Sequence, residues 1–120
     1  MADADAMVST SVLEETSLVV LEALSLGLPV VCHDACGMGV AVTDECGIKV
    51  PMHTPDQSVA GYAAALSELA LGGPRFESLS RGALARAREL DWDNKAAAMA
   101  RTYESVISAN SAVPRAKKSP

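Results

Sequence analysis

The sequence has 120 residues, a formal net charge of −5 and 49% hydrophobic residues, values that fit one small acidic globular domain. The acidic balance argues against a nucleic-acid-binding protein, which normally presents a basic face. No apolar run approaches the roughly 18 residues of a membrane span, and the first residues lack the basic stretch of a secretory signal. We therefore expect a cytoplasmic protein, with peripheral association with a membrane left open.

Short apolar segments alternate with helical ones in the first half of the chain. Strands are expected at residues 6–9, 29–32 and 46–50. A helix that begins at Leu18 and ends before a turn at Gly27 separates the first two strands. A loop at residues 33–39 and a helical turn near residues 40–42 separate the last two. This alternation predicts an α/β fold with a three-stranded parallel sheet and flanking helices, which is half of a doubly wound, Rossmann-like sheet.

Longer amphipathic segments follow in the second half. Helices are expected at residues 56–71, 75–89 and 92–108, the first of which starts at Thr54-Pro55. The apolar stripe of the first is Val59, Tyr62, Ala63, Leu66, Leu69 and Ala70. The second is expected to carry Leu79, Ala83, Leu84 and Ala87 on one side and Arg81, Arg86 and Arg88 on the other.

The last helix and the C-terminal residues complete the predicted domain. Trp92 and Tyr103 are expected to anchor the last helix by packing. Residues 1–109 are expected to form one domain, and residues 110–120 a disordered tail with nothing to bury.

Glu22 is the only polar residue between Leu18 and Leu24. A buried carboxylate costs several kcal/mol unless a partner satisfies it, and no basic residue lies within one helical turn. We therefore expect Glu22 to be buried and held for a ligand, together with Glu14 on the preceding turn. The alternative is a solvated turn acid and an ordinary surface acid on the helix.

The turn before this helix predicts an anion site. Thr16 and Ser17 are good N-cap residues for a helix that begins at Leu18. The free N–H groups and the dipole of the helix favour an anion, and in a parallel sheet this helix end lies where ligands bind. A phosphate here, with hydroxyls near Glu14 and Glu22, indicates a nucleotide or a nucleotide sugar.

The spacing of these residues resembles a known family signature. Glu14-x7-Glu22, followed by Ala23-Leu24-x-x-Gly27-x-Pro29-Val30-Val31, resembles the Glu-x7-Glu motif of retaining glycosyltransferases with the two-domain GT-B fold, of the family 4 or group 1 type. The similarity continues through Cys46–Pro51 and Asp91–Tyr103. The resemblance implies that Glu14, in the catalytic position, contacts the donor sugar and that Glu22 holds the ribose. It also implies that backbone N–H groups of Thr16, Ser17 and Leu18 contact the sugar and the diphosphate. The family usually has Gly-Phe-Gly where this chain has Glu15-Thr16-Ser17.

The resemblance covers the C-terminal, donor-binding part of such an enzyme. The acceptor domain and the first half of the donor domain are unmatched, and so is the basic pair that neutralises the leaving diphosphate. We expect a fragment that binds a nucleotide-sugar donor, serves transfer to an unknown acceptor with retention in the full-length enzyme, and is inactive alone. No metal or other cofactor is expected. Two alternatives stay open: a non-catalytic subunit that completes a split glycosyltransferase, and an interaction domain without a ligand.

The cysteines and histidines do not form a zinc pattern. Cys32-x3-Cys36 has a suitable spacing, but no second close pair accompanies it. Cys32, Cys36 and Cys46 are expected to be reduced and buried. His33 and Asp34, at the end of a strand, either line the donor pocket or belong to a polar loop.

The first expected strand, residues 6–9, has an apolar outer edge. In a doubly wound sheet it would neighbour a strand from a missing N-terminal half or a partner subunit. An unpaired apolar edge predicts self-association or poor solubility of the chain alone.

Overall fold

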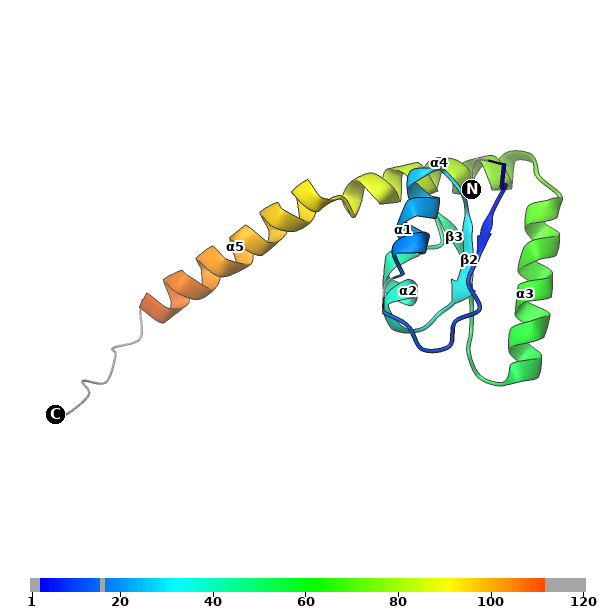
Figure 1. Cartoon of the computed structure of the whole chain (residues 1–120), viewed down its shortest axis with the longest axis horizontal. Helices are drawn as coiled ribbons and strands as arrows, with labels where there is room; N and C mark the ends of the chain where they lie inside the picture. The colour runs from blue at the N-terminus through cyan, green and yellow to red at the C-terminus, as the bar shows by residue number, and fades with distance from the viewer. Residues whose placement is uncertain (1–2, 16, 112–120) are drawn as a thin grey trace. The chain divides into compact units, whose positions relative to one another are not determined.

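The computed structural model describes residues 3–15 and 17–111. Contacts divide the chain into two compact units, Met1–Leu90 and Asp91–Pro120. The elements of the first unit are β1 (Met7–Val8), α1 (Leu18–Ser25), β2 (Val30–His33), α2 (Cys36–Ala41), β3 (Gly47–Val50), α3 (Pro55–Ala70) and α4 (Gly73–Glu89) (Figure 1). The second unit contains α5 (Trp92–Ser111). No helix among the described residues is long and apolar enough to cross a membrane.

The three strands form one parallel sheet in the order β1-β2-β3. Met7 lies opposite Val30, and Val31 lies opposite Ile48. The predicted α/β fold with a three-stranded parallel half-sheet and flanking helices is therefore confirmed. The expected loop at residues 33–39 is shorter than predicted, because α2 already begins at Cys36.

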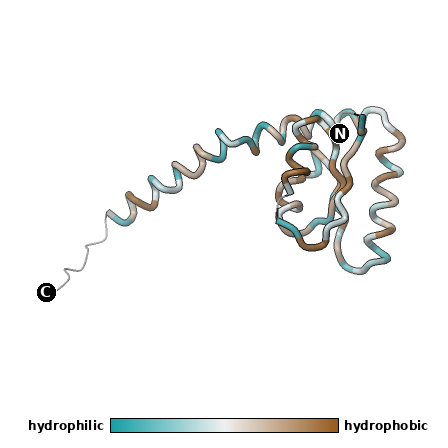
Figure 2. Tube along the Cα trace, in the orientation of Figure 1, coloured by the Kyte–Doolittle hydropathy of each residue, from teal (hydrophilic) through white to brown (hydrophobic). Residues whose placement is uncertain are grey.

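Each face of the sheet has its own apolar cluster. One cluster joins α1, α2 and β2 and consists of Val20, Ala23, Leu24, Leu28, Val30, Cys32, Met38, Val42, Cys46 and Ala83. The other joins α3 to the opposite face and consists of Val31, Val50, Ala65, Leu69 and Leu79. Figure 2 shows the hydrophobic residues concentrated on the strands that lie between these helices.

Helix α4 crosses the amino-terminal ends of β2 and β3 and joins the two clusters, since Leu79 belongs to one and Ala83 to the other. Gly82 makes this approach close: a Cβ there would collide with the carbonyl oxygen of Glu45, in the turn before β3. The Ser80 hydroxyl donates to the carbonyl oxygen of Gly27, in the turn before β2, at 2.7 Å. The carboxyl-terminal ends of the strands are left to the loops.

Arg86, expected on the side of α4 opposite the apolar residues, is partly buried. Its Nε and Nη2 donate to the carbonyl oxygens of Ala41 and Val40, each at 2.9 Å. Arg86 thereby closes the C-terminal end of α2. Of the three arginines expected on that side of α4, Arg81 and Arg88 are exposed.

Helix α3 starts where predicted, because the Thr54 hydroxyl accepts a hydrogen bond from the Gln57 amide at 3.3 Å. Its buried face differs from the predicted stripe. Ala65 and Leu69 are buried and Tyr62 is half-buried, whereas four members of the stripe are exposed: Val59, Ala63, Leu66 and Ala70. The reason is Gly61, at which the helix backbone approaches the Val50 side chain.

The expectation that Trp92 and Tyr103 anchor α5 by packing concerns its contact with the first unit and stays a prediction. Asn110 and Ser111, expected in the tail, belong to α5. The rest of the expected tail, residues 112–120, lies outside the described part of the chain.

Candidate functional site

An open cleft of about 420 Å³ lies at the carboxyl-terminal end of the sheet. It is lined by Leu13, Glu14, Glu15, Cys36 and Gly37. The first three residues belong to the segment that follows β1, and the last two follow β2 at the start of α2. The cleft therefore sits over the ends of two adjacent parallel strands, where α/β sheets bind ligands.

The two predicted carboxylates lie in different surroundings. Glu14 is half-buried and lines the cleft. Glu22 is exposed and is not among the residues that line it, so the expectation of a buried carboxylate is wrong. The core-facing side of α1 carries three buried residues, Val20, Ala23 and Leu24. At 3.6 residues per turn, position 22 points away from all three.

An exposed carboxylate needs no internal partner, so the composition of α1 does not imply a ligand. Its exposure does leave Glu22 accessible to a ligand hydroxyl. The role that the family resemblance assigns to Glu22 stays a prediction.

Helix α1 begins at Leu18, as predicted, with Ser17 at its N-cap. The Ser17 carbonyl oxygen accepts from the amides of Val20 and Leu21 at 3.1 and 3.4 Å, but its side chain makes no capping hydrogen bond. Thr16 lies outside the described residues. Because neither the Ser17 hydroxyl nor an acidic side chain of the first turn occupies the first amides, these amides suit an anion.

His33 is the last residue of β2 and supports the segment that leads to Glu14. Its side chain is buried, with Nδ1 3.2 Å from the Ser11 carbonyl oxygen and Nε2 3.2 Å from the Ser58 hydroxyl. A carbonyl oxygen only accepts, so Nδ1 carries the hydrogen, and in the neutral ring Nε2 accepts from Ser58. His33 is thus a structural residue rather than a lining of the cleft.

Tyr62 adds to this support from α3. Its ring packs edge-on against His33 at 5.0 Å between centroids, and its hydroxyl donates to the Ser9 carbonyl oxygen at 2.6 Å. Together the two rings tie the segment after β1 to β2 and α3. The pKa of Tyr62 is raised to about 12, mainly by burial and to a smaller extent by the nearby Cys32 thiol. A hydrogen bond with the His33 backbone lowers the pKa and offsets part of this rise.

Asp34 and Lys49 hold the turn between β2 and α2. Lys49 Nζ lies 3.3 Å from Asp34 Oδ1 and donates to the Gly39 carbonyl oxygen at 3.5 Å. A Cβ at Gly39 would lie 3.0 Å from the same Asp34 oxygen, so the glycine leaves room for the carboxylate. Asp34 is therefore part of a support for α2, a role that the sequence left undecided.

The cysteines divide into two buried thiols and one exposed thiol. Cys32 and Cys46 are buried as expected, and burial raises the pKa of Cys32 to about 11. Cys36 was expected to be buried, but it is exposed on the cleft with a φ of 53°, in the left-handed region that non-glycine residues rarely adopt. No group of three or more His, Cys, Asp or Glu side chains among the described residues is placed to hold a metal ion.

The fold is that of an α/β protein, with a cleft at the carboxyl edge of a parallel sheet, where such sheets bind ligands. A solved structure, sucrose-phosphate synthase from Thermosynechococcus elongatus, resembles this chain with a TM-score of 0.65 at 24% identity. The match covers 85% of this chain and 26% of that chain. This likeness to part of a GT-B glycosyltransferase confirms the predicted fold.

Residues 1–71 match the family described as glycosyl transferases group 1, and the chain belongs to this family. D-inositol 3-phosphate glycosyltransferases from Streptomyces bingchenggensis and Jonesia denitrificans are each 38% identical to it, over 101 and 106 residues. These matches cover 83% and 87% of this chain but only 21% and 23% of the relatives. The chain thus spans less than a quarter of the length of these relatives.

Proposed function

We propose that this chain is the donor-binding part of a retaining glycosyltransferase of the family 4 type and that it binds a nucleotide sugar. The observation that carries the proposal is the position of Glu14. In a chain of this family, the first carboxylate of the Glu-x7-Glu motif lines a cleft over the ends of two parallel strands.

The cleft suits the sugar end of such a donor. Its volume of about 420 Å³ lies within the range of small-molecule sites. A sugar hydroxyl that donates to the Glu14 carboxylate forms a charge-assisted hydrogen bond, worth about 1.5–3 kcal/mol. The same proposal assigns the ribose to Glu22, on the strength of the motif spacing alone.

The diphosphate is assigned to the start of α1. Backbone N–H groups of Ser17 and Leu18, together with that of Thr16, are proposed to donate to the sugar and the diphosphate. The half charge at a helix N-terminus stabilises an anion, and α1 has no acidic residue in its first turn that would compete for these amides.

Transfer with retention to an acceptor is proposed for the whole enzyme, not for this chain alone. The leaving diphosphate needs cations, which we assign to the part of the enzyme outside this chain, and no metal or other cofactor is proposed. A cytoplasmic location belongs to the same proposal, because all three cysteines are free thiols. The second candidate is a non-catalytic subunit that completes a split glycosyltransferase, favoured by the short span of the chain relative to its relatives.

Cys36 provides a direct test of donor binding. It lines the same cleft as Glu14 and is the exposed one of the three cysteines. The full chain is treated with limiting iodoacetamide, with and without UDP-glucose or GDP-mannose, and the alkylation rate of Cys36 is followed by mass spectrometry. We expect one of the nucleotide sugars to slow the reaction, with Cys32 and Cys46 unreactive in all samples.

Variants separate binding at this site from a general effect of the nucleotide. Glu14→Gln and Glu22→Gln are each expected to weaken the protection about tenfold, the loss of one charge-assisted hydrogen bond. Glu45→Gln is the control, because Glu45 is an exposed acid before β3, at the other end of the sheet. The proposed donor site would be ruled out if neither nucleotide sugar protects Cys36, or if protection is equal in all variants.

A further inference from the structure

Two neighbouring acids line the cleft at the carboxyl-terminal end of the sheet. Glu14 is half-buried, and Glu15, the next residue, is exposed. The remaining lining residues, Leu13, Cys36 and Gly37, offer no basic side chain. Because glutamate side chains are negatively charged at neutral pH, the lining of this cleft carries negative charge.

The basic side chains that flank α2 are engaged elsewhere. Lys49 Nζ lies 3.3 Å from Asp34 Oδ1, in the turn that leads to α2. Arg86 donates to the Val40 and Ala41 carbonyl oxygens at the far end of α2. Neither basic residue is among those that line the cleft. A ligand in the cleft therefore meets two carboxylates and, within the described part of the chain, no lining cation to offset them.

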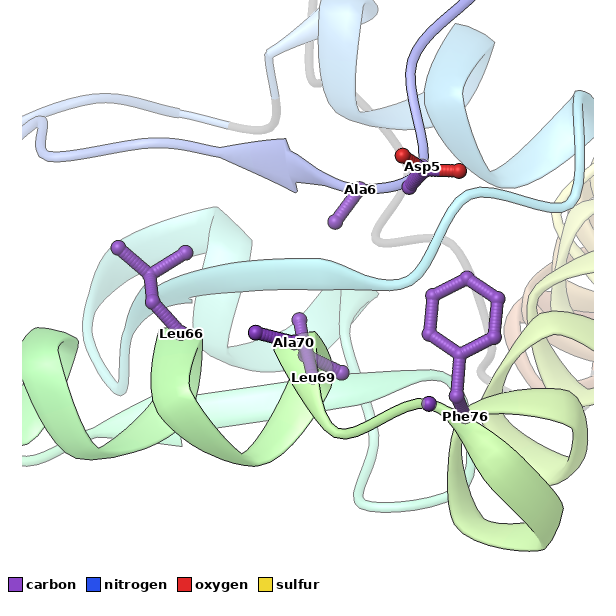
Figure 3. Close-up of a pocket in the computed structure, with 7 residues that line it drawn as sticks. Asp5, Ala6, Leu66, Leu69, Ala70 and Phe76 are labelled. Carbon is purple, nitrogen blue, oxygen red and sulfur yellow. The ribbon is translucent and has the colours of Figure 1, made fainter.

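Another cleft of the first unit has a different character. It has a volume of about 380 Å³ and lies beside the segment before β1, at the amino-terminal end of the strands. Figure 3 shows Leu66 of α3 and Phe76 of α4 pointing toward the segment that carries Ala6. Asp5 is the one charged residue among the described residues that line it. An apolar lining does not suit a sugar with many hydroxyl groups, so the paired carboxylates set the Glu14 cleft apart.

We infer that the cleft lined by Glu14 selects nucleotide sugars by charge, accepting an uncharged sugar and disfavouring a sugar that carries a carboxylate. The inference rests on the proposed function, because the cleft selects among donors only if a donor binds there. Glu14 keeps its assigned contact with a sugar hydroxyl, and Glu15 is the residue that determines specificity. A uronic acid has a carboxylate at C6 in place of a hydroxymethyl group, and both glutamates repel that carboxylate.

The size of the selectivity follows from the distance between the charges and from their contact with water. Like charges about 4–6 Å apart near a protein surface change an equilibrium constant by a few-fold to about a hundredfold, depending on solvent exposure. Glu15 is exposed, so we expect about tenfold, which corresponds to about 1.4 kcal/mol. Salt screens this repulsion, since the Debye length falls from about 8 Å at 0.15 M to about 3 Å at 1 M. A steric cause of selectivity would not depend on salt in this way.

The charge of the cleft is measured first, without a donor. Cys36 lines the cleft, and its rate of alkylation by iodoacetate, an anion, is compared with its rate with neutral iodoacetamide. Dividing this ratio by the same ratio for N-acetylcysteine amide corrects for the reactivity of the two reagents. We expect a corrected ratio below about one third in the wild-type chain and a rise of about threefold in Glu15→Gln. Asp5→Asn removes an exposed acid from the other cleft and is the matched control, for which the wild-type ratio is expected.

Matched donors then test the selection itself. UDP-glucose is paired with UDP-glucuronate, and GDP-mannose with GDP-mannuronate, so the members of each pair share their base and diphosphate. The concentration that halves the alkylation of Cys36 by iodoacetamide should be about tenfold higher for the uronate, in the wild-type chain and in Asp5→Asn. Glu15→Gln should reduce this difference to about threefold or less, and Glu15→Lys should abolish or reverse it. Raising the salt to about 1 M should also reduce the difference in the wild-type chain.

The outcomes separate this inference from the proposed function. Circular dichroism melting verifies that each variant is folded. Equal protection by both members of a pair, or a difference that persists in Glu15→Lys and at high salt, would overturn the inference and leave the proposed function standing. Protection by none of the four donors would overturn both. A corrected alkylation ratio of about one in the wild-type chain would also overturn the inference, because the cleft would then repel an anion no more than a free thiol does.

Discussion

Arg86 offers the sharpest test of how the chain supports the cleft that Glu14 lines. The side chain is 21% exposed, and its guanidinium donates to the last carbonyl groups of α2 and to Glu89, the latter at 2.7 Å. Arg86→Met keeps much of the apolar stem but removes all three hydrogen bonds. The part-buried bond to Ala41 is worth about 1.5–3 kcal/mol, and each of the exposed bonds about 0.5 kcal/mol. Water partly replaces the lost donors, so we expect a loss of about 2 kcal/mol.

Urea denaturation followed by circular dichroism measures this loss. With a slope of about 1 kcal/mol per molar urea for a domain of this size, the midpoint falls by about 2 M. Arg81→Met is the matched control on α4, because the Arg81 side chain is 72% exposed and lies 3.8 Å from Glu77. Such a pair contributes less than about 0.5 kcal/mol. The reasoning is refuted if Arg86→Met lowers the midpoint no more than Arg81→Met does.

Three further predictions concern stability. Gly82→Ala is expected to lower the free energy of unfolding by about 1–3 kcal/mol in the same assay, because its Cβ meets the Glu45 backbone; an unchanged midpoint would contradict that packing. Burial raises the pKa of Cys32 from 9.0 to about 11 and that of Tyr62 from 10.0 to about 12. The folded chain therefore keeps protons that the unfolded chain loses, so the melting temperature should fall as the pH rises from about 9 to 12. The fall should be less steep in Tyr62→Phe, and a melting temperature that does not change with pH would count against both pKa shifts. Glu22→Gln is expected to change stability by less than about 0.5 kcal/mol, since Glu22 is exposed, whereas a clear gain in stability would restore the buried-acid hypothesis.

Local chemistry predicts the order of the elements in this chain. Thr54 and Pro55 mark the start of α3, and the hydroxyl of Thr54 makes the expected capping bond. The rotation of α3 about its axis is not predicted by the same pattern. Small residues, Gly61 and Ala65, face the sheet because they allow close approach to Val50, whereas a hydropathy stripe gives more weight to large side chains such as Val59.

The sequence predicts the position of a residue in the candidate site only where that position is set by residues nearby in the chain. Glu14 belongs to the segment between β1 and α1 and lines the cleft, a position that the strand order suggests. The apolar sequence of α1 does not predict the exposure of Glu22, because α1 carries apolar residues on its exposed side too, such as Leu18, which is 70% exposed. Arg86 and Ala41 are 45 positions apart, so no local pattern indicates that they meet.

The residues that shape the cleft beside Glu14 are distinct from those that line it. His33 and Lys49 hydrogen-bond to the Ser11 and Gly39 carbonyl oxygens, and Arg86 closes the far end of α2. The cleft itself is lined by Glu14 and the exposed Cys36 among others. Because a supporting side chain forms its hydrogen bonds with backbone groups, its substitution is expected to lower the free energy of unfolding first. A lining side chain makes few such bonds, so its substitution should change binding of the proposed donor at nearly constant stability. Variants of the two groups are therefore told apart by which quantity changes first, the free energy of unfolding or donor binding.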